Sequence, residues 1–362
     1  MYGRGARTVA ALALVAALTA VLAGLASCSP APPPAAGAPR CQPESLPVRL
    51  SAPATTSYHV SGWLCADGSP RVVEVLIPGL TYGASYWNFP LDPARYSYVR
   101  AATAAGFATL AIDRLGTGTS SHPPAADVTA TSEAYALHLI VQRLRSGLPG
   151  HGRFGTVVLV GHSYGSDVAL REAAAYGDVA GVISTGWLTA GNPAGHLQVR
   201  NSYDAAAPDD PKFAHVSLPD GYVTTKPGTR GADFYNTAYA SPAVIGEDEV
   251  LKETVTSGEL ASVVVPIPAA STRQIKVPVL LADGQDDNLD CSASLPGVSC
   301  ASAAALIARE QPNYAPAACL QAFVLPKAGH SINLHPDAPQ WFAEANRWVR
   351  AYVTHPGCAK TS

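Results

Sequence analysis

Apolar and polar positions follow two different rhythms along the chain. Short apolar runs, typical of buried strands, alternate with longer segments in which apolar residues recur at helical spacing. The runs predict strands at 48–51, 58–65, 72–77, 107–112, 157–160, 179–184, 277–282 and 321–325. The helical spacing predicts helices at 93–105, 132–144, 167–175, 244–261 and 339–353.

Because strands and helices alternate, we expect an α/β domain with a mostly parallel sheet that is covered on both faces. The alternation stops over 186–270, a segment rich in Gly, Pro, Asn and Asp, and resumes afterwards. We therefore predict a lid inserted at 186–270 between two core segments, 45–185 and 271–358.

The first residues have the pattern of an export signal. Arg4 and Arg7 precede an apolar run at 8–25, which ends in Leu25-Ala26-Ser27-Cys28. This ending resembles a bacterial lipobox, which implies that 1–27 is removed and that the Cys28 thiol is lipidated. An ordinary secretory peptide or a spanning anchor is the alternative.

The Pro- and Ala-rich residues that follow predict a tether over 28–44, since proline favours an extended spacer. Together with the lipobox, the tether implies an exported protein that is held at the extracytoplasmic face of the cell membrane. In a two-membrane cell the outer membrane is the other possibility. The membrane is then one partner of the protein.

Composition narrows the other partners. Hydrophobic residues make up 48% of the chain and charged residues 14%, so a large core is expected. The formal net charge is -3 and no basic stripe is present, which argues against a nucleic-acid partner.

Seven cysteines fit the same exported location, because removing Cys28 leaves an even number. No metal-ligand spacing is evident among them. From the expected positions of the strand ends we predict the disulfides Cys41–Cys65, Cys291–Cys300 and Cys319–Cys358.

The strongest chemical signal is Gly161-His162-Ser163-Tyr164-Gly165. It follows an apolar strand and precedes a helix, the context of a nucleophile elbow, in which a sharp turn exposes the serine oxygen. A serine hydroxyl is a weak nucleophile and needs an adjacent base.

Candidate acids and a base follow two later strands. Asp286 and Asp287 come after the strand at 277–282, and His330 comes after the strand at 321–325. We expect His330 to take the proton of Ser163, and one of the two aspartates to orient His330.

An oxyanion would also need backbone N–H donors. Tyr164 supplies one by position, and Leu80 is the expected second donor, with Thr81 as the alternative. Tyr82, Tyr86 and Trp87 follow this turn and either line an acyl pocket or pack against the first helix.

The chain resembles the α/β-hydrolases from about residue 45 to residue 355. The resemblance rests on the elbow, on the turn Asp113-Arg114-Leu115-Gly116-Thr117-Gly118-Thr119-Ser120, on Gly284 to Asp287, and on Gly329-His330. It implies an eight-stranded, mostly parallel sheet, and its Gly-x-x-Asp spacing favours Asp287 as the acid. The family's usual His-Gly is Pro78-Gly79 here, and we interpret Asp113 and Arg114 as structural turn residues.

Related dehalogenases and epoxide hydrolases use an Asp nucleophile, whereas a serine at position 163 favours acyl transfer. We therefore expect a serine hydrolase acting on carboxylic esters, with no metal or other cofactor. The first alternative is an exopeptidase similar to secreted serine aminopeptidases, which would cleave an amide. The second is a binding lipoprotein without catalytic activity.

Overall fold

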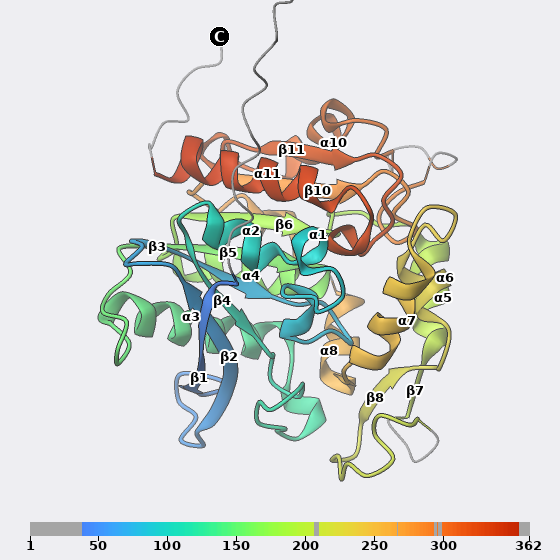
Figure 1. Cartoon of the computed structure of the whole chain (residues 1–362), viewed down its shortest axis with the longest axis horizontal. Helices are drawn as coiled ribbons and strands as arrows, with labels where there is room; N and C mark the ends of the chain where they lie inside the picture. Colours follow the sequence, from blue (N-terminus) through green and yellow to red (C-terminus); the bar gives the residue numbers. More distant parts are fainter. Residues whose placement is uncertain (1–37, 206–209, 266, 293–294, 296–298, 355–362) are drawn as a thin grey trace, which may run out of the picture. The chain divides into compact units, whose positions relative to one another are not determined.

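The computed structural model describes residues 38–205, 210–265, 267–292, 295 and 299–354. Its centre is an eight-stranded sheet in the order β1-β2-β4-β3-β5-β6-β10-β11 (Figure 1). β1 and β2 are antiparallel, as are β2 and β4, and the other neighbours are parallel. The strands are β1 Arg40–Val48, β2 Tyr58–Ala66, β3 Val72–Ile77, β4 Ala108–Ile112, β5 Thr156–His162, β6 Gly181–Thr185, β10 Val279–Gly284 and β11 Gln321–Leu325.

The predicted fold class is confirmed, and the strand order also locates the site. β3 lies between β4 and β5, so the chain leaves β3 toward one edge of the sheet and later returns to its other side. Open α/β sheets bind ligands at such a switch point, beyond the carboxyl ends of the strands. The residues that follow β3 and β5 are therefore placed side by side.

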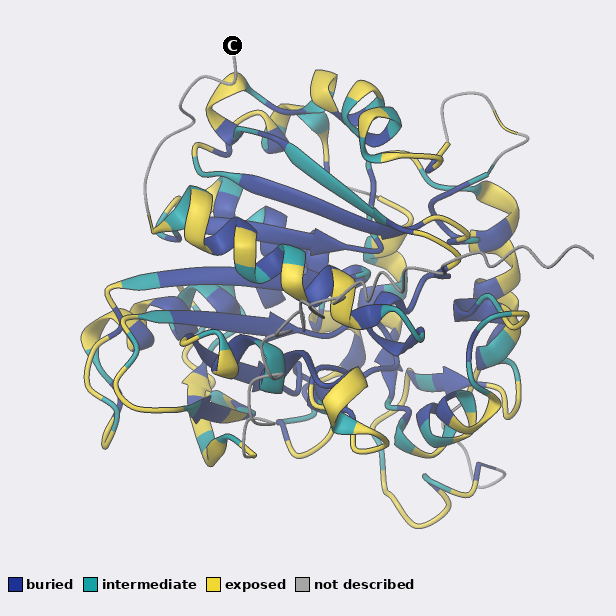
Figure 2. Cartoon of the chain, turned by 45° about the horizontal axis from the view of Figure 1, so that its top comes forward, coloured by how far each residue is buried: buried dark blue, intermediate teal, exposed yellow. Residues whose placement is uncertain are grey.

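Helices cover both faces of the sheet. α2 (Tyr98–Ala104) and α11 (Ala338–Trp348) pack together on one face, and α3 (Ala130–Ser146) and α4 (Tyr164–Tyr176) pack together on the other (Figure 1). The central strands are buried, the edge strands β1 and β11 are partly exposed, and the outer sides of the helices are exposed (Figure 2). The short helices of this body are α1 Pro93–Tyr96, α9 Ala269–Thr272 and α10 Ala303–Glu310.

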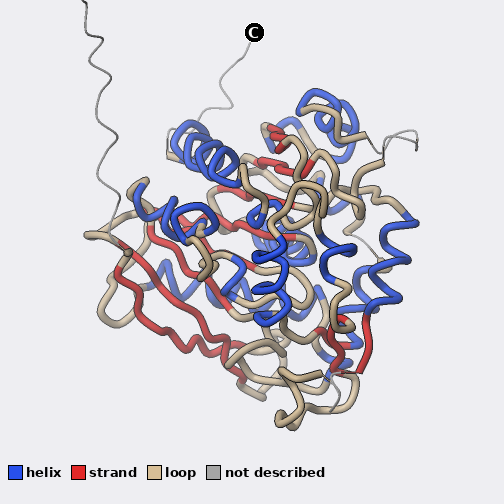
Figure 3. Tube along the Cα trace, turned by 45° about the vertical axis from the view of Figure 1, so that its right-hand side comes forward, coloured by secondary structure: helices blue, strands red, loops and turns tan. Residues whose placement is uncertain are grey.

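The segment between β6 and α9 lies outside the eight-stranded sheet and is called the insertion below. It contains short helices and an antiparallel sheet in the order β7-β8-β9 (Figure 3). Its elements are α5 Pro193–Ser202, β7 Tyr203–Ala205, β8 Tyr222–Thr225, α6 Arg230–Phe234, α7 Pro242–Leu251, β9 Val255–Thr256 and α8 Ser257–Val263.

The prediction of a single helix over 244–261 is wrong. α7 ends at Leu251, β9 intervenes, and α8 begins after Thr256. Thr256 and Glu259 form a capping box, in which each side chain accepts a backbone N–H of the other residue. This local hydrogen bonding starts a new helix where the apolar spacing alone predicted a continuous one.

Two other boundaries differ from the prediction. The helix expected over 93–105 is split at Ser97, whose hydroxyl caps α2 by accepting the Arg100 N–H. The first strand was expected at 48–51 but runs over Arg40–Val48, so it includes residues assigned to the tether. Pro43 and Pro47 obscured it, yet an edge strand tolerates proline because one side of its ladder is unpaired.

Two of the predicted disulfides are present, Cys41–Cys65 between β1 and β2 and Cys291–Cys300 in the loop after β10. Cys358 and the lipobox with Cys28 lie outside the described residues, so Cys319–Cys358 and lipidation stay predictions. Within the described ranges, no helix has the length and apolar character needed to cross a membrane.

Candidate active site

Ser163 occupies the tight turn between β5 and α4. Its backbone has φ 54° and ψ −124°, a strained conformation for a residue other than glycine. The turn requires glycine on both sides, because a Cβ on Gly161 would lie 2.5 Å from the Gly165 carbonyl oxygen, and one on Gly165 would lie 2.3 Å from that of Ile77. The Ser163 N–H donates to the carbonyl of Thr185 at 2.7 Å, which fixes the turn against β6.

His330 and Asp287 are joined by a hydrogen bond. The His330 Nδ1 lies 2.8 Å from the Asp287 Oδ2, and both side chains are buried. The other carboxylate oxygen of Asp287 accepts the backbone N–H groups of Leu289 and Asp290. Because an ionised carboxylate only accepts, Nδ1 carries the proton and the His330 Nε2 is left with a lone pair.

Asp286, the rival acid, points elsewhere. It is exposed, and its Oδ2 accepts from the side-chain amide of Asn236 at 2.8 Å. The structure thus gives the contact with His330 to Asp287, the residue that the Gly-x-x-Asp spacing favours.

The charges of the pair reinforce each other. Burial would raise the pKa of Asp287, but the charge and hydrogen bond of His330 outweigh it and lower the pKa to about 2. Burial would likewise lower the pKa of His330, but Asp287 outweighs it and the pKa rises above its usual value. Burial, followed by the charge of Asp287, raises the pKa of Asp283. The same two causes raise the pKa of Asp290 to about 8. Negative charge is therefore concentrated on Asp287.

Two glycines bring these parts together. A Cβ on Gly186, directly after β6, would lie 3.1 Å from the Cε1 atoms of both His162 and His330. A Cβ on Gly79, after β3, would lie 3.0 Å from the Cβ of Ser163. The elbow, the His330 loop and the turn after β3 thus converge at the carboxyl ends of the strands.

The turn after β3 contains Leu80 and Thr81, the two residues considered for the second oxyanion donor. The Tyr82 N–H donates to the Gly79 carbonyl at 3.2 Å, and Thr81 has φ 59°, as at the third position of a type II turn. The hydrogen bond that closes the turn does not use the N–H groups of Leu80 and Thr81. Tyr164, the other expected donor, is the first residue of α4, where an N–H has no acceptor within the helix.

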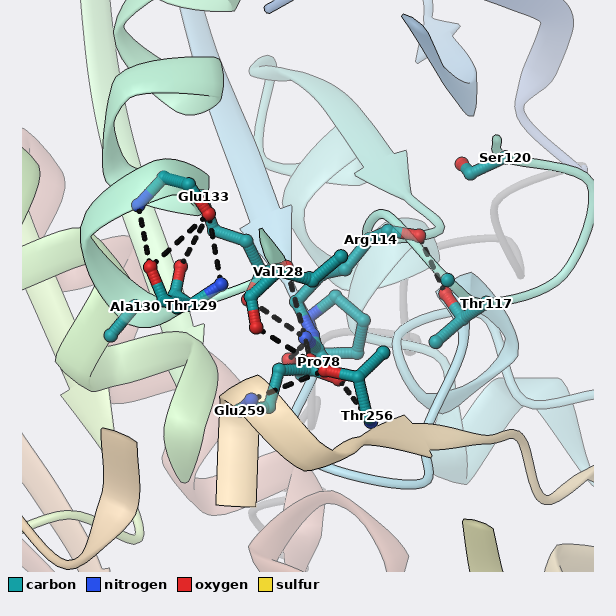
Figure 4. Close-up of polar contacts among 12 residues, drawn as sticks. Pro78, Arg114, Thr117, Ser120, Val128, Thr129, Ala130, Glu133, Thr256 and Glu259 are labelled. Carbon is teal, nitrogen blue, oxygen red and sulfur yellow. Dashed lines mark hydrogen bonds and ion pairs between the residues drawn. The ribbon is translucent and has the colours of Figure 1, made fainter. Parts of the chain in front are cut away.

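A buried arginine holds the backbone carbonyls of that turn. Arg114 donates from Nε to the Pro78 carbonyl at 2.9 Å and from Nη2 to the Gly79 carbonyl at 3.1 Å (Figure 4). Its Nη1 forms ion pairs with Glu133 of α3 and Glu259 of α8. Arg114 is therefore more than a turn residue. Its side chain joins α3 of the core and α8 of the insertion to the turn after β3.

Side chains of the insertion form hydrogen bonds with the same turn. Arg230 of α6 forms a two-bond ion pair with Asp248 of α7, at 2.9 and 3.0 Å, and both are buried. The Arg230 Nη1 also donates to the Thr81 Oγ1 at 2.9 Å. The Tyr82 hydroxyl donates to Asp248 at 3.3 Å and lies 2.6 Å from the Ser331 Oγ, beside His330.

The insertion holds the other side of the His330 loop as well. The Ser331 N–H donates to the Phe234 carbonyl at 2.9 Å. The His335 Nε2 accepts the N–H groups of Gly329 and of Asn236, so His335 is neutral at that nitrogen and joins the loop to the insertion. Sequence analysis missed Arg230, Asp248 and His335, because each acts through partners that lie in other segments of the chain.

The aromatic residues after the turn pack inside the protein rather than line an acyl pocket. Tyr86 stacks on His162 with ring centroids 4.3 Å apart, and Trp87 packs edge-on against Tyr98 of α2. Tyr82 is also buried and covers His162 at 5.6 Å. Asp287, Asp290 and His330 bring three possible metal-ligand atoms within 4.8 Å, but the oxygens of Asp287 already accept three hydrogen bonds.

A family model described as "Alpha/beta hydrolase family" matches residues 75–345 of this sequence. The chain belongs to the alpha/beta hydrolase family. No curated protein matches this hydrolase. Among solved structures it is similar to an E-2-(acetamidomethylene)succinate hydrolase, with a TM-score of 0.56, 17% identity, and coverage of 86% of this chain and 100% of that one.

Two further solved structures are similar to the chain. The monoacylglycerol lipase of Paleococcus ferrophilus has a TM-score of 0.53 and 17% identity, and the match covers 80% of this chain and 98% of that one. An esterase of Pyrococcus furiosus has a TM-score of 0.52 and 15% identity, with coverage of 86% and 92%. At these identities the likeness shows the fold of the hydrolase and no more.

Proposed function

We propose that this hydrolase cleaves carboxylic esters through an acyl-enzyme, with Ser163 as nucleophile, His330 as base and Asp287 as the acid that orients it. The observation that carries the proposal is the buried Asp287–His330 hydrogen bond at the same strand ends as the strained Ser163. Together with the serine elbow, this pair has the arrangement of a catalytic triad.

In this mechanism the His330 Nε2 takes the proton of the Ser163 Oγ as that oxygen attacks the ester carbonyl carbon. The carbonyl oxygen becomes negative and accepts from the N–H groups of Tyr164 and Leu80. His330 returns the proton to the alcohol oxygen as the ester bond breaks. Water, deprotonated by His330, then attacks the acyl-serine, and the carboxylic acid and free Ser163 are formed.

The two acids of the insertion that lie beside the turn after β3 support an ester over a substrate with a free amine. An exopeptidase needs an unpaired carboxylate to bind that amine. Among the described residues beside the Thr81 turn, Asp248 is paired with Arg230, and Glu253 is paired with Lys212 at 2.9 Å. Both acids are therefore already neutralised by a basic side chain.

A fluorophosphonate probe and two substrate panels test the proposal on the full chain. We expect covalent labelling and turnover of p-nitrophenyl esters, both lost in Ser163→Ala and both retained in the matched variant Ser146→Ala at the end of α3. Turnover of aminoacyl anilides in preference to esters would instead establish an exopeptidase. An unlabelled, inactive but folded wild type would leave the binding lipoprotein as the function.

We also propose that the hydrolase is attached to a membrane through a lipidated Cys28. The support is the sequence of 8–28 and the Pro- and Ala-rich residues behind it, which place an anchor and a spacer before β1. An esterase held in this way would act on substrates outside the cytoplasm.

A further inference from the structure

Three ligand-type side chains meet on the helical face formed by α3 and α4. His138 extends from α3, Glu172 from α4, and Asp178 from the loop that joins α4 to β6. One nitrogen of His138 and one oxygen of each carboxylate lie within 4.8 Å of one another. None of these residues takes part in the proposed acyl transfer.

Glu172 is the unusual member of the group. Its side chain is 0% exposed, and neither carboxylate oxygen has a hydrogen-bond partner. A buried carboxylate without hydrogen bonds is costly, so the position requires either a proton or a cation.

The geometry around His138 favours a cation. Its Nδ1 lies 2.9 Å from the Asp178 Oδ2 and 3.6 Å from the Glu172 Oε1, yet it has no hydrogen-bond partner. Around an ion with bonds of about 2.1 Å, neighbouring ligand atoms lie about 3.0–3.4 Å apart and off each other's axis. A direct His–carboxylate hydrogen bond would be in line instead.

The surroundings of His138 can leave Nδ1 open to an ion. The His138 Nε2 lies 2.8 Å from the Gln142 Nε2, and a half-turn of that amide would place its oxygen there to accept Nε2–H. With the amide turned in this way, Nδ1 is unprotonated beside the two carboxylates, as a metal-binding histidine requires. Tyr176 stacks on the His138 ring with centroids 3.9 Å apart and limits its rotation.

We propose that His138, Glu172 and Asp178 form a binding site for a divalent transition-metal ion, with Zn²⁺ as the ion of choice. One imidazole and two carboxylates suit such an ion, and their two negative charges balance it. His138 and Asp178 are 14% and 21% exposed, so water can complete the coordination from the outer side. The ion would tie α3 to α4, the helix that starts directly after Ser163.

Zn²⁺ titration of the full chain in mild detergent tests this site after treatment with a chelator. We expect one Zn²⁺ to bind by calorimetry and to raise the melting temperature. His138→Ala and Glu172→Gln should each weaken binding by about tenfold or more. Co²⁺ should give tetrahedral or five-coordinate absorption bands that are lost in the same variants.

Two control variants separate this site from others in the chain. His151 is equally exposed at 14% and lies 3.3 Å from Glu44 alone, so His151→Ala should bind Zn²⁺ like the wild type. His330→Ala should also bind normally, because the proposed site does not use the triad. The proposal is overturned if the wild type binds no Zn²⁺, if binding survives both His138→Ala and Glu172→Gln, or if His330→Ala abolishes it.

Discussion

Asp287 accepts a hydrogen bond from His330 at 2.8 Å, whereas Asp286, its neighbour in sequence, is exposed and bonded to Asn236. Two adjacent acids therefore have different environments. The charge of Asp287 is buried against a partner that becomes cationic during the proposed reaction, and that of Asp286 is in contact with water. Only the first can change the basicity of His330 strongly.

The first prediction concerns pH. His330 must be neutral to accept the serine proton, and its pKa is raised above the usual 6.5, so kcat/KM should fall as pH drops through a midpoint above 6.5. Asp287→Asn should move this midpoint to lower pH and reduce kcat by about 10³–10⁴-fold. Asp286→Asn is the control and should leave both unchanged. A profile that is flat from pH 5 to 8 in folded enzyme would contradict the role of His330.

The second prediction concerns the arginine below the oxyanion turn. Arg114→Lys keeps a positive charge between Glu133 and Glu259 but loses the two-armed contact with the Pro78 and Gly79 carbonyls. We expect kcat to fall by about tenfold or more while KM changes little, since the turn serves the transition state. Steady-state kinetics measures both values, and Arg347→Lys at an exposed ion pair is the control. A change in KM alone would show that the turn binds substrate and not the oxyanion.

The third prediction separates stability from activity in the insertion. Asp248→Asn leaves the buried Arg230 without its counter-charge and should lower the free energy of unfolding by about 3–5 kcal/mol. Replacing both residues, as Arg230→Met with Asp248→Leu, should recover most of that stability. Activity should stay low, because Thr81 and Tyr82 lose their polar partners.

Denaturant unfolding and ester turnover of the same samples check this prediction. The exposed pair Lys226–Asp204 offers a comparison, and Lys226→Met should cost about 0–1 kcal/mol. Full activity in the stable double variant would mean that the pair only holds the insertion together.

The fourth prediction compares the disulfides. Cys291 donates its N–H to the Asp287 carbonyl at 2.9 Å, so removing Cys291–Cys300 should lower kcat more than the melting temperature. Removing Cys41–Cys65, which closes a longer loop (sequence separation 24 against 9), should lower the melting temperature and leave kcat unchanged. Of the three predicted bonds, we expect Cys319–Cys358 to contribute most to stability. Calorimetry and kinetics on the double-serine variants decide the order, and equal losses of kcat in all of them would contradict it.

The fifth prediction concerns the anchor. Cys28→Ser leaves no thiol to acylate, so the variant should accumulate unprocessed or leave the membrane fraction. Cell fractionation with mass spectrometry of the N-terminus measures both. Membrane retention of a correctly cleaved Cys28→Ser variant would rule out lipidation as the anchor.

The parts of the fold that sequence analysis predicted well are those specified locally. The elbow needs only a strand, two glycines and a helix around Ser163, and all of them are contiguous. Asp287 and His330 were predicted because parallel strands end at one edge of the sheet, which converts order along the chain into proximity.

The rest depended on contacts between distant segments. The pairing of β1 with β2 makes a strand of residues whose own sequence suggests a spacer. The Arg230–Asp248 pair is stable only inside the assembled insertion, and periodicity does not register a buried charge pair. The break before α8 was readable in part, since Thr256 and Glu259 have capping-box spacing.

The bond between Cys41 and Cys65 has a mechanical consequence. It joins the second residue pair of the antiparallel β1–β2 ladder, directly behind the pair Arg40–Ala66 where β1 begins. A pull on the preceding residues would load the ladder from its end and open its hydrogen bonds one at a time. The covalent link stops that peeling after a single pair and passes the load to β2, inside the sheet. A protein dragged by its N-terminus would thus keep its edge strand in place.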